Sequence, residues 1–138
     1  MKPFDTIEPK QARNLNGLVL AYVGDAVQSL IVRTKLATEH DFKAGELHKL
    51  TSQTVNARAQ ADLAEHLLAQ NLLTEDEKDV FMRARNGKSH HKANNAAGSD
   101  YRKASGLEAV IGYLYLIGNY SRIEELLSVQ PMPNNSEE

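Results

Sequence analysis

Two acidic residues, Asp25 and Glu108, lie inside apolar segments where an isolated carboxylate would be costly to bury. Asp25 stands in LAYVGDAV at 20–27, and Glu108 stands in SGLEAVIG at 105–112. A buried ionised carboxylate is strongly destabilising unless it is paired, hydrogen-bonded or bound to a cation. Two carboxylates that meet can hold a hard cation such as Mg²⁺, or they can share a proton for acid–base catalysis. The alternatives without chemistry are a helix N-cap for Asp25 and, for Glu108, a helix-edge acid bonded to a nearby Arg or Tyr.

A glycine lies close to each acid and suggests how the two acids could meet. Gly24 directly precedes Asp25, and Gly106 lies two residues before Glu108. Glycine within a helix costs about 0.5–1 kcal/mol relative to alanine, but it lets two backbones approach closely. We therefore expect two helices to cross near Gly24 and Gly106 and to bring the two carboxyl groups together.

The segments that position these acids have the apolar spacing of helices. Apolar residues recur every three or four positions after Asn14, which predicts a capped helix from there to about Ala37. A second helical stretch is expected from about Asp41 to Leu68, with a break near 51–52. No segment shows sustained alternation of apolar and polar residues, so the predicted fold class is all-α, without a sheet.

Capping and turn residues divide the second half of the chain. TEDE at 74–77 and SRIE at 121–124 have the pattern of a capping box, which predicts that a helix starts at each. Asn86 and Gly87 predict a helix end, the polar residues 86–100 predict a loop, and helix is expected again from about Tyr101. We expect an irregular lead-in at 1–13, one domain at 14–130 and a disordered tail at 131–138.

Composition narrows the class of protein. The chain has 138 residues, of which 41% are hydrophobic and 25% charged, as in a single globular domain. It has no cysteine, which excludes disulfides, thiolate zinc sites and cysteine nucleophiles and fits a reducing cytoplasm. No apolar run approaches the roughly 18 residues that span a bilayer, so no membrane association is expected.

Charge is distributed unevenly along the chain. The net charge is −2, but the segment from Arg83 to Lys103 holds six cations and only one acid, Asp100. A basic segment on an acidic body is a directional feature that suits a polyanionic partner. The alternative is a solvated loop followed by a charged helix start.

Three blocks of the chain resemble the ribonuclease III family. LAYVGDAV at 20–27 is similar to the family's signature helix, and FMRARNGKS at 81–89 and YRKASGLEAVIGYLY at 101–115 resemble its later blocks. The resemblance extends from about 14 to 127 and is greatest to the short Mini-III branch, which lacks a separate domain that binds double-stranded RNA. The larger enzymes carry further carboxylates where this chain has Ala21 and Ser105, so the number of metal ions stays open.

The resemblance implies a helical, dimeric catalytic domain that cuts double-stranded RNA and leaves 5′ phosphates. It implies that Asp25 and Glu108 are the catalytic residues and hold Mg²⁺, with Mn²⁺ as a substitute. The residues expected to contact RNA are Arg83, Arg85, Asn86, Lys88, Ser89, His90, Lys92, Arg102 and Lys103. Tyr22, Tyr113 and Tyr115 are expected in the core or at an interface rather than under RNA bases.

The expected partners follow from the same resemblance. They are precursor large-subunit (23S) ribosomal RNA, cut in the duplex formed by its two ends, and a second copy of the chain. A ribosomal protein that presents the RNA is a further expected partner. The alternative function is a non-catalytic, RNA-binding or ribosome-associated scaffold on the same fold.

Overall fold

Every regular element in the described part of the chain is a helix, which confirms the predicted all-α class. The structure, a computed structural model, describes residues 2, 4–39, 43–54, 57–87 and 96–131. Its helices are α1 (Pro9–Arg13), α2 (Gly17–Glu39), α3 (Ala44–Thr54), α4 (Ala57–Ala69), α5 (Glu75–Arg85), α6 (Ala96–Leu116) and α7 (Tyr120–Leu127). None of these described helices combines the length and apolar character that a membrane crossing needs.

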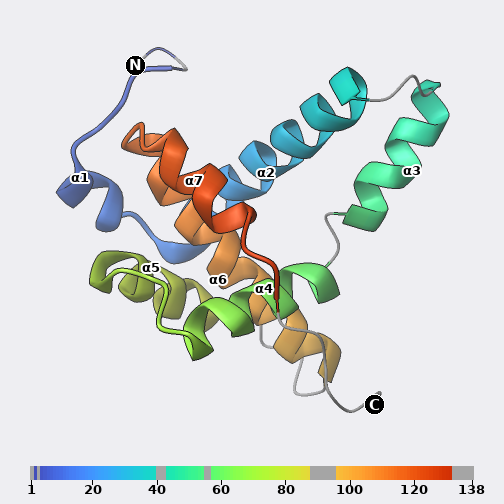
Figure 1. Cartoon of the computed structure of the whole chain (residues 1–138). Helices are drawn as coiled ribbons and strands as arrows, with labels where there is room; N and C mark the ends of the chain where they lie inside the picture. Colours follow the sequence, from blue (N-terminus) through green and yellow to red (C-terminus); the bar gives the residue numbers. More distant parts are fainter. Residues whose placement is uncertain (1, 3, 40–42, 55–56, 88–95, 132–138) are drawn as a thin grey trace.

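Helix α6 is the central element of the fold. Helices α2, α4 and α5 pack against it, and Figure 1 shows it running through the middle of the molecule. Its side chains Leu107, Val110, Ile111 and Leu114 are buried, as expected for a helix that other helices surround. Its largest contact is with α2, so the two segments that carry the acids are neighbours.

The contact between α2 and α6 depends on glycine, but on a different pair from the one predicted. A Cβ added at Gly24 would overlap the carbonyl oxygen of Glu108 and lie 2.8 Å from the backbone nitrogen of Gly112. A Cβ at Gly112 would in turn overlap the carbonyl oxygen of Leu20. The two backbones are therefore in direct contact at Gly24 and Gly112, and the helices run antiparallel. Gly106 does not lie at this crossing.

Gly106 instead makes room for an aromatic ring. A Cβ at this position would lie 2.7 Å from the ring of Phe81, which is almost fully buried. The glycine therefore lets α5 approach the opposite side of α6. The prediction that Gly106 lies where the two acid-bearing helices cross was wrong, because Gly106 faces α5 and not α2.

Several helix boundaries also differ from the predictions. Residues 1–13 are not wholly irregular, because Pro9 begins α1 in the first-turn position that proline favours. Asn14 ends α1 rather than capping the next helix. Asn16 takes that role, and its Oδ1 accepts a 2.8 Å hydrogen bond from the backbone N–H of Leu18.

Later boundaries shift in the same way. Helix α3 continues through 51–52, where a break was predicted, and α6 begins at Ala96 rather than near Tyr101. The predicted capping box at 121–124 is also wrong. The cap of α7 is Asn119, whose side chain accepts from the backbone N–H of Arg122.

The predicted capping box at 74–77 is confirmed, and it has a second role. The Thr74 side chain accepts from the Glu77 backbone, and the Glu77 carboxylate accepts from the Thr74 backbone. Glu77 is only 3% exposed and also receives two hydrogen bonds from Arg122, at 2.8 and 2.9 Å. Burial raises the pKa of Glu77, but the bonds from Arg122 and Thr74 outweigh it and hold the pKa below its usual value. This ion pair fastens α7 to the start of α5.

Candidate active site

Asp25 and Glu108 meet, as the sequence predicts, where α2 crosses α6. Asp25 follows the contact glycine Gly24 and is solvent-exposed, whereas Glu108 is only partly exposed and its backbone touches Gly24. Their carboxyl groups lie within hydrogen-bonding reach of each other. The close glycine contact thus aligns one carboxyl from each helix at the same point on the surface.

The environment of the pair acts on the proton of Glu108. Burial, the hydrogen bond with Asp25 and the negative charge of Asp25 together raise the pKa of Glu108 to about 8. Near neutral pH, without a cation, Glu108 therefore keeps a proton that it can donate to the Asp25 carboxylate. A bound cation would stabilise the ionised form of both carboxyl groups.

The donor set fits a hard divalent cation that is only partly held by protein. Two carboxylates supply oxygen ligands, which Mg²⁺ prefers, and Mg²⁺ commonly keeps several of its waters. No cluster of three or more His, Cys, Asp or Glu side chains able to hold a metal occurs among the described residues. Ala21 and Ser105 lie one turn away from Asp25 and Glu108 and are both buried. The remaining ligands of such an ion would be waters or substrate oxygens.

The cations predicted to contact RNA have different surroundings. Arg85 is partly exposed, and in the described part of the chain its Nη1 makes a weak contact with Met82 Sδ at 3.7 Å. Asn86 is exposed at the end of α5. Lys103 donates to Glu65 of α4 at 3.1 Å, which leaves it partly neutralised. Arg102 is partly exposed and precedes Glu108 by six residues, about 9 Å along the α6 axis.

Arg83 makes several hydrogen bonds within the protein through its guanidinium group. It donates to the backbone carbonyls of Arg13 and Leu15 and to the carboxylate of Asp79. Its predicted contact with RNA stays untested. The predicted RNA-binding residues Lys88, Ser89, His90 and Lys92 lie outside the described residues.

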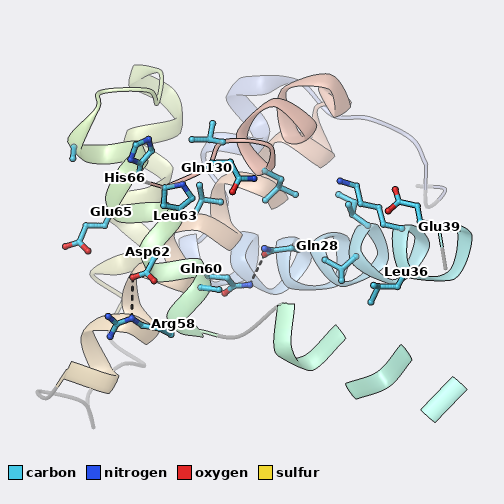
Figure 2. Close-up of a pocket in the computed structure, with 18 residues that line it drawn as sticks. Gln28, Leu36, Glu39, Arg58, Gln60, Asp62, Leu63, Glu65, His66 and Gln130 are labelled. Carbon is cyan, nitrogen blue, oxygen red and sulfur yellow. Dashed lines mark hydrogen bonds and ion pairs between the residues drawn. The ribbon is translucent and has the colours of Figure 1, made fainter. Parts of the chain in front are cut away.

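A groove of about 1100 Å³ lies away from the acid pair. It runs between the second half of α2, helix α4 and residues 127–131, and neither Asp25 nor Glu108 lines it. Figure 2 shows Gln28 and Gln60 in this groove, joined by a 2.9 Å hydrogen bond between their side-chain amides. The groove and the carboxylate pair are therefore separate features, and the candidate chemistry belongs to the carboxylate pair.

The outer face of α2 is apolar and uncovered. Tyr22, expected in the core or at an interface, is 81% exposed and so is not a core residue. Val19 and Leu30, at 49% and 64% exposure, lie on the same helical face together with Ala26. Tyr113, by contrast, is buried as expected and Tyr115 is half-buried.

Gly112 is the site-forming residue that sequence reasoning missed. It lies one turn after Glu108, on the same face of α6, and its lack of a side chain admits α2. Its position four residues after Glu108 places it on the same helix face, and this spacing could have indicated the crossing point. Two glycines at nearby positions on one helix cannot be told apart until it is known which neighbour each one faces.

Comparison with known proteins supports this description of the chain. The model of the ribonuclease III domain matches residues 18–119, a span that includes both acids. Proteins named Mini-ribonuclease 3 are similar to this chain in Enterococcus faecalis (43% identity, covering 84% of this chain and 88% of the relative) and Staphylococcus aureus (42%, covering 90% and 92%). A solved structure of a Fusobacterium nucleatum protein shares the fold, with a TM-score of 0.72 and 29% identity over 83% of this chain and 92% of that one.

Proposed function

Because the chain belongs to the ribonuclease III family, we propose that it is an endoribonuclease that cuts double-stranded RNA at the Asp25–Glu108 pair. The observation that carries this proposal is the meeting of the two carboxyl groups at the crossing of α2 and α6. The similarity to proteins named Mini-ribonuclease 3 supports the reaction class.

The roles of the two acids follow from their positions. Asp25 and Glu108 would be the residues that hold a divalent cation, and Glu108 would be deprotonated in that state. When bound, Mg²⁺ (or Mn²⁺ in its place) supplies an activated water and neutralises charge that develops on the phosphate. The carboxylates orient and bind, and neither attacks phosphorus.

The RNA duplex lies along the cations near this pair. Proteins recognise A-form RNA mainly by its shape, through phosphates and 2′-hydroxyl groups across the shallow minor groove. Arg85 and Asn86 at the end of α5, and Arg102 on α6, are exposed enough to make such contacts. Lys103 would have to exchange Glu65 for a phosphate.

The active form is a homodimer joined through the outer face of α2. Val19, Tyr22 and Leu30 supply an apolar stripe on that face, and contiguous exposed apolar surface is typical of an association site. A two-fold dimer places the same patch on both copies. Because each chain carries its own acid pair, a dimer presents two sites, one for each RNA strand.

The substrate is precursor 23S ribosomal RNA in the cytoplasm, cut in the duplex formed by its two ends. The resemblance to the short Mini-III branch supports this choice. A ribosomal protein that presents the RNA would compensate for the small binding surface of a single domain. Equal cutting of naked RNA and protein-bound precursor would remove the need for that partner.

Cleavage of duplex RNA by matched variants tests the function. Asp25→Asn and Glu108→Gln should each lower the cutting rate by about a thousandfold or more, because each removes one of two charged oxygen ligands. Glu124→Gln, which removes an exposed acid of α7, should cut like the wild type. Chelation of Mg²⁺ should stop cutting and its return should restore it. Salt-sensitive duplex binding without metal-dependent cutting would instead support the non-catalytic scaffold.

A further inference from the structure

Arg83 joins the segment that leads into α2 to the end of α5. Its Nη1 donates to the Leu15 carbonyl at 2.9 Å, its Nη2 donates to the Arg13 carbonyl, and its Nε donates to Asp79 at 3.2 Å. Arg13 is the last residue of α1, and Leu15 lies in the short connection between α1 and α2. All three guanidinium nitrogens are therefore directed at the protein, in the fixed planar arrangement that only arginine offers.

Two glycines bring the same two helix ends into contact. A Cβ at Gly17, the first residue of α2, would lie 2.7 Å from the backbone nitrogen of Ala84 in α5. A Cβ at Gly87 would lie 2.9 Å from the side chain of Leu18. The first turn of α2 thus rests directly on the last turn of α5, beside the Arg83 contacts.

This joint links the helix that carries Asp25 to the helix that ends at the predicted RNA contacts. Helix α2 carries Asp25 two turns beyond Gly17, and α5 presents Arg85 and Asn86 at its end. A movement of α5 against α2 would therefore displace the RNA-binding side chains from the acid pair. Arg85, only two residues from Arg83, has no comparable contact with a carbonyl in the described part of the chain.

We propose that Arg83 is a positioning residue, not a phosphate-binding one: its guanidinium group sets the distance between the RNA contacts on α5 and the carboxylates on α2 and α6. This inference rests on the proposed nuclease function. Lysine cannot replace arginine at such a position. Its single ammonium group lacks the rigid, planar set of donors that reaches two carbonyls and a carboxylate at once. At a phosphate contact, by contrast, lysine keeps most of the electrostatic attraction.

The salt dependence of RNA binding separates the two roles. Each phosphate contact adds roughly 0.7–0.9 to the slope of log affinity against log salt concentration. Wild type, Arg83→Lys, Arg83→Gln, Arg85→Lys and Arg85→Gln are titrated with a short RNA duplex in chelator, so that no cutting occurs. Arg85→Gln should lose about one unit of slope, and Arg85→Lys should keep it. Both Arg83 variants should keep the wild-type slope.

Cutting rates and hydrogen exchange complete the test. With Mg²⁺, Arg83→Lys should lower kcat/KM by about tenfold or more through misplacement of the substrate, and amide exchange in the first turn of α2 should accelerate. If Arg83→Gln lowers the slope as Arg85→Gln does and Arg83→Lys restores binding, the proposal is overturned. Should Arg83→Gln fail to fold, Arg83→Lys still decides by its slope and exchange. A wild type that cuts no duplex would overturn the proposed function, and amide exchange in Arg83→Lys would still show whether Arg83 holds the joint.

Discussion

Glu108 is a partly buried carboxyl group with a second carboxyl, that of Asp25, beside it. Burial and Asp25 both favour the protonated form, and together they raise the pKa of Glu108 to about 8. A protein without a cation therefore carries at this point an acid that resists ionisation. Ionising Glu108 beside Asp25 is therefore unfavourable unless a positive ion binds to the pair.

The raised pKa predicts how the stability of the metal-free protein changes with pH. In the unfolded chain Glu108 titrates near its ordinary value of 4.5, and in the folded chain near 8. Between these values the folded state holds the extra proton, so the free energy of unfolding falls as pH rises through this window. After allowance for solvent screening at a partly exposed site, we expect a loss on the order of 1 kcal/mol.

Urea denaturation in chelator from pH 5 to pH 9 measures this loss. Glu108→Gln cannot ionise and should remove the decline, whereas Asp25→Asn should only reduce it, because burial still acts on Glu108. A decline of the same size in Glu108→Gln would show that another group is responsible.

At the scale of helices, the sequence predicts local features better than contacts. Thr74 and Glu77 specify their capping box within one turn, so this helix start was predicted correctly. The start of α6 was placed too late because residues 96–100 are small or charged and form no apolar stripe. In this first part of α6, Asp100 Oδ2 lies 3.8 Å from Arg58 Nη1 of α4. No local sequence pattern reveals this contact.

The same limit applies to the candidate site. The pairing of Asp25 with Glu108 was predicted because an acid inside an apolar helical segment is costly to bury without a partner, and because nearby glycines let two helices approach. The choice between Gly106 and Gly112 as the crossing point was wrong, because it depends on which side of α6 receives Phe81. The internal role of Arg83 was missed for a similar reason, since its carbonyl partners lie 68 and 70 residues away.

The crossing of α2 and α6 predicts an unequal response to equivalent glycine substitutions. Gly24→Ala should lower the free energy of unfolding by about 3 kcal/mol, because the new methyl group meets a backbone carbonyl that cannot move alone. Gly45→Ala in α3 is the control, with no atom within 4 Å of the added Cβ. It should be neutral or stabilising by about 0.5 kcal/mol. Thermal or urea unfolding measures both, and equal stability of the two variants would contradict the close crossing.

At the scale of the whole molecule, the exposed apolar face of α2 predicts a dimer that can be broken without harm to either acid pair. Leu30→Glu places a charge at the C-terminal end of this stripe, and loss of this apolar contact should weaken dimerisation by about 30-fold or more. Leu72→Glu is the matched control, because Leu72 is also exposed but follows α4, outside the stripe.

Light scattering after size-exclusion chromatography should show a dimer for the wild type and for Leu72→Glu, and a monomer for Leu30→Glu. Asp25 and Glu108 come from the same chain, so the monomer should keep the carboxylate pair. It has only one such pair, however, and should nick one strand of a duplex where the dimer cuts both. A monomeric wild type that makes double-strand cuts would show that α2 faces solvent during the reaction.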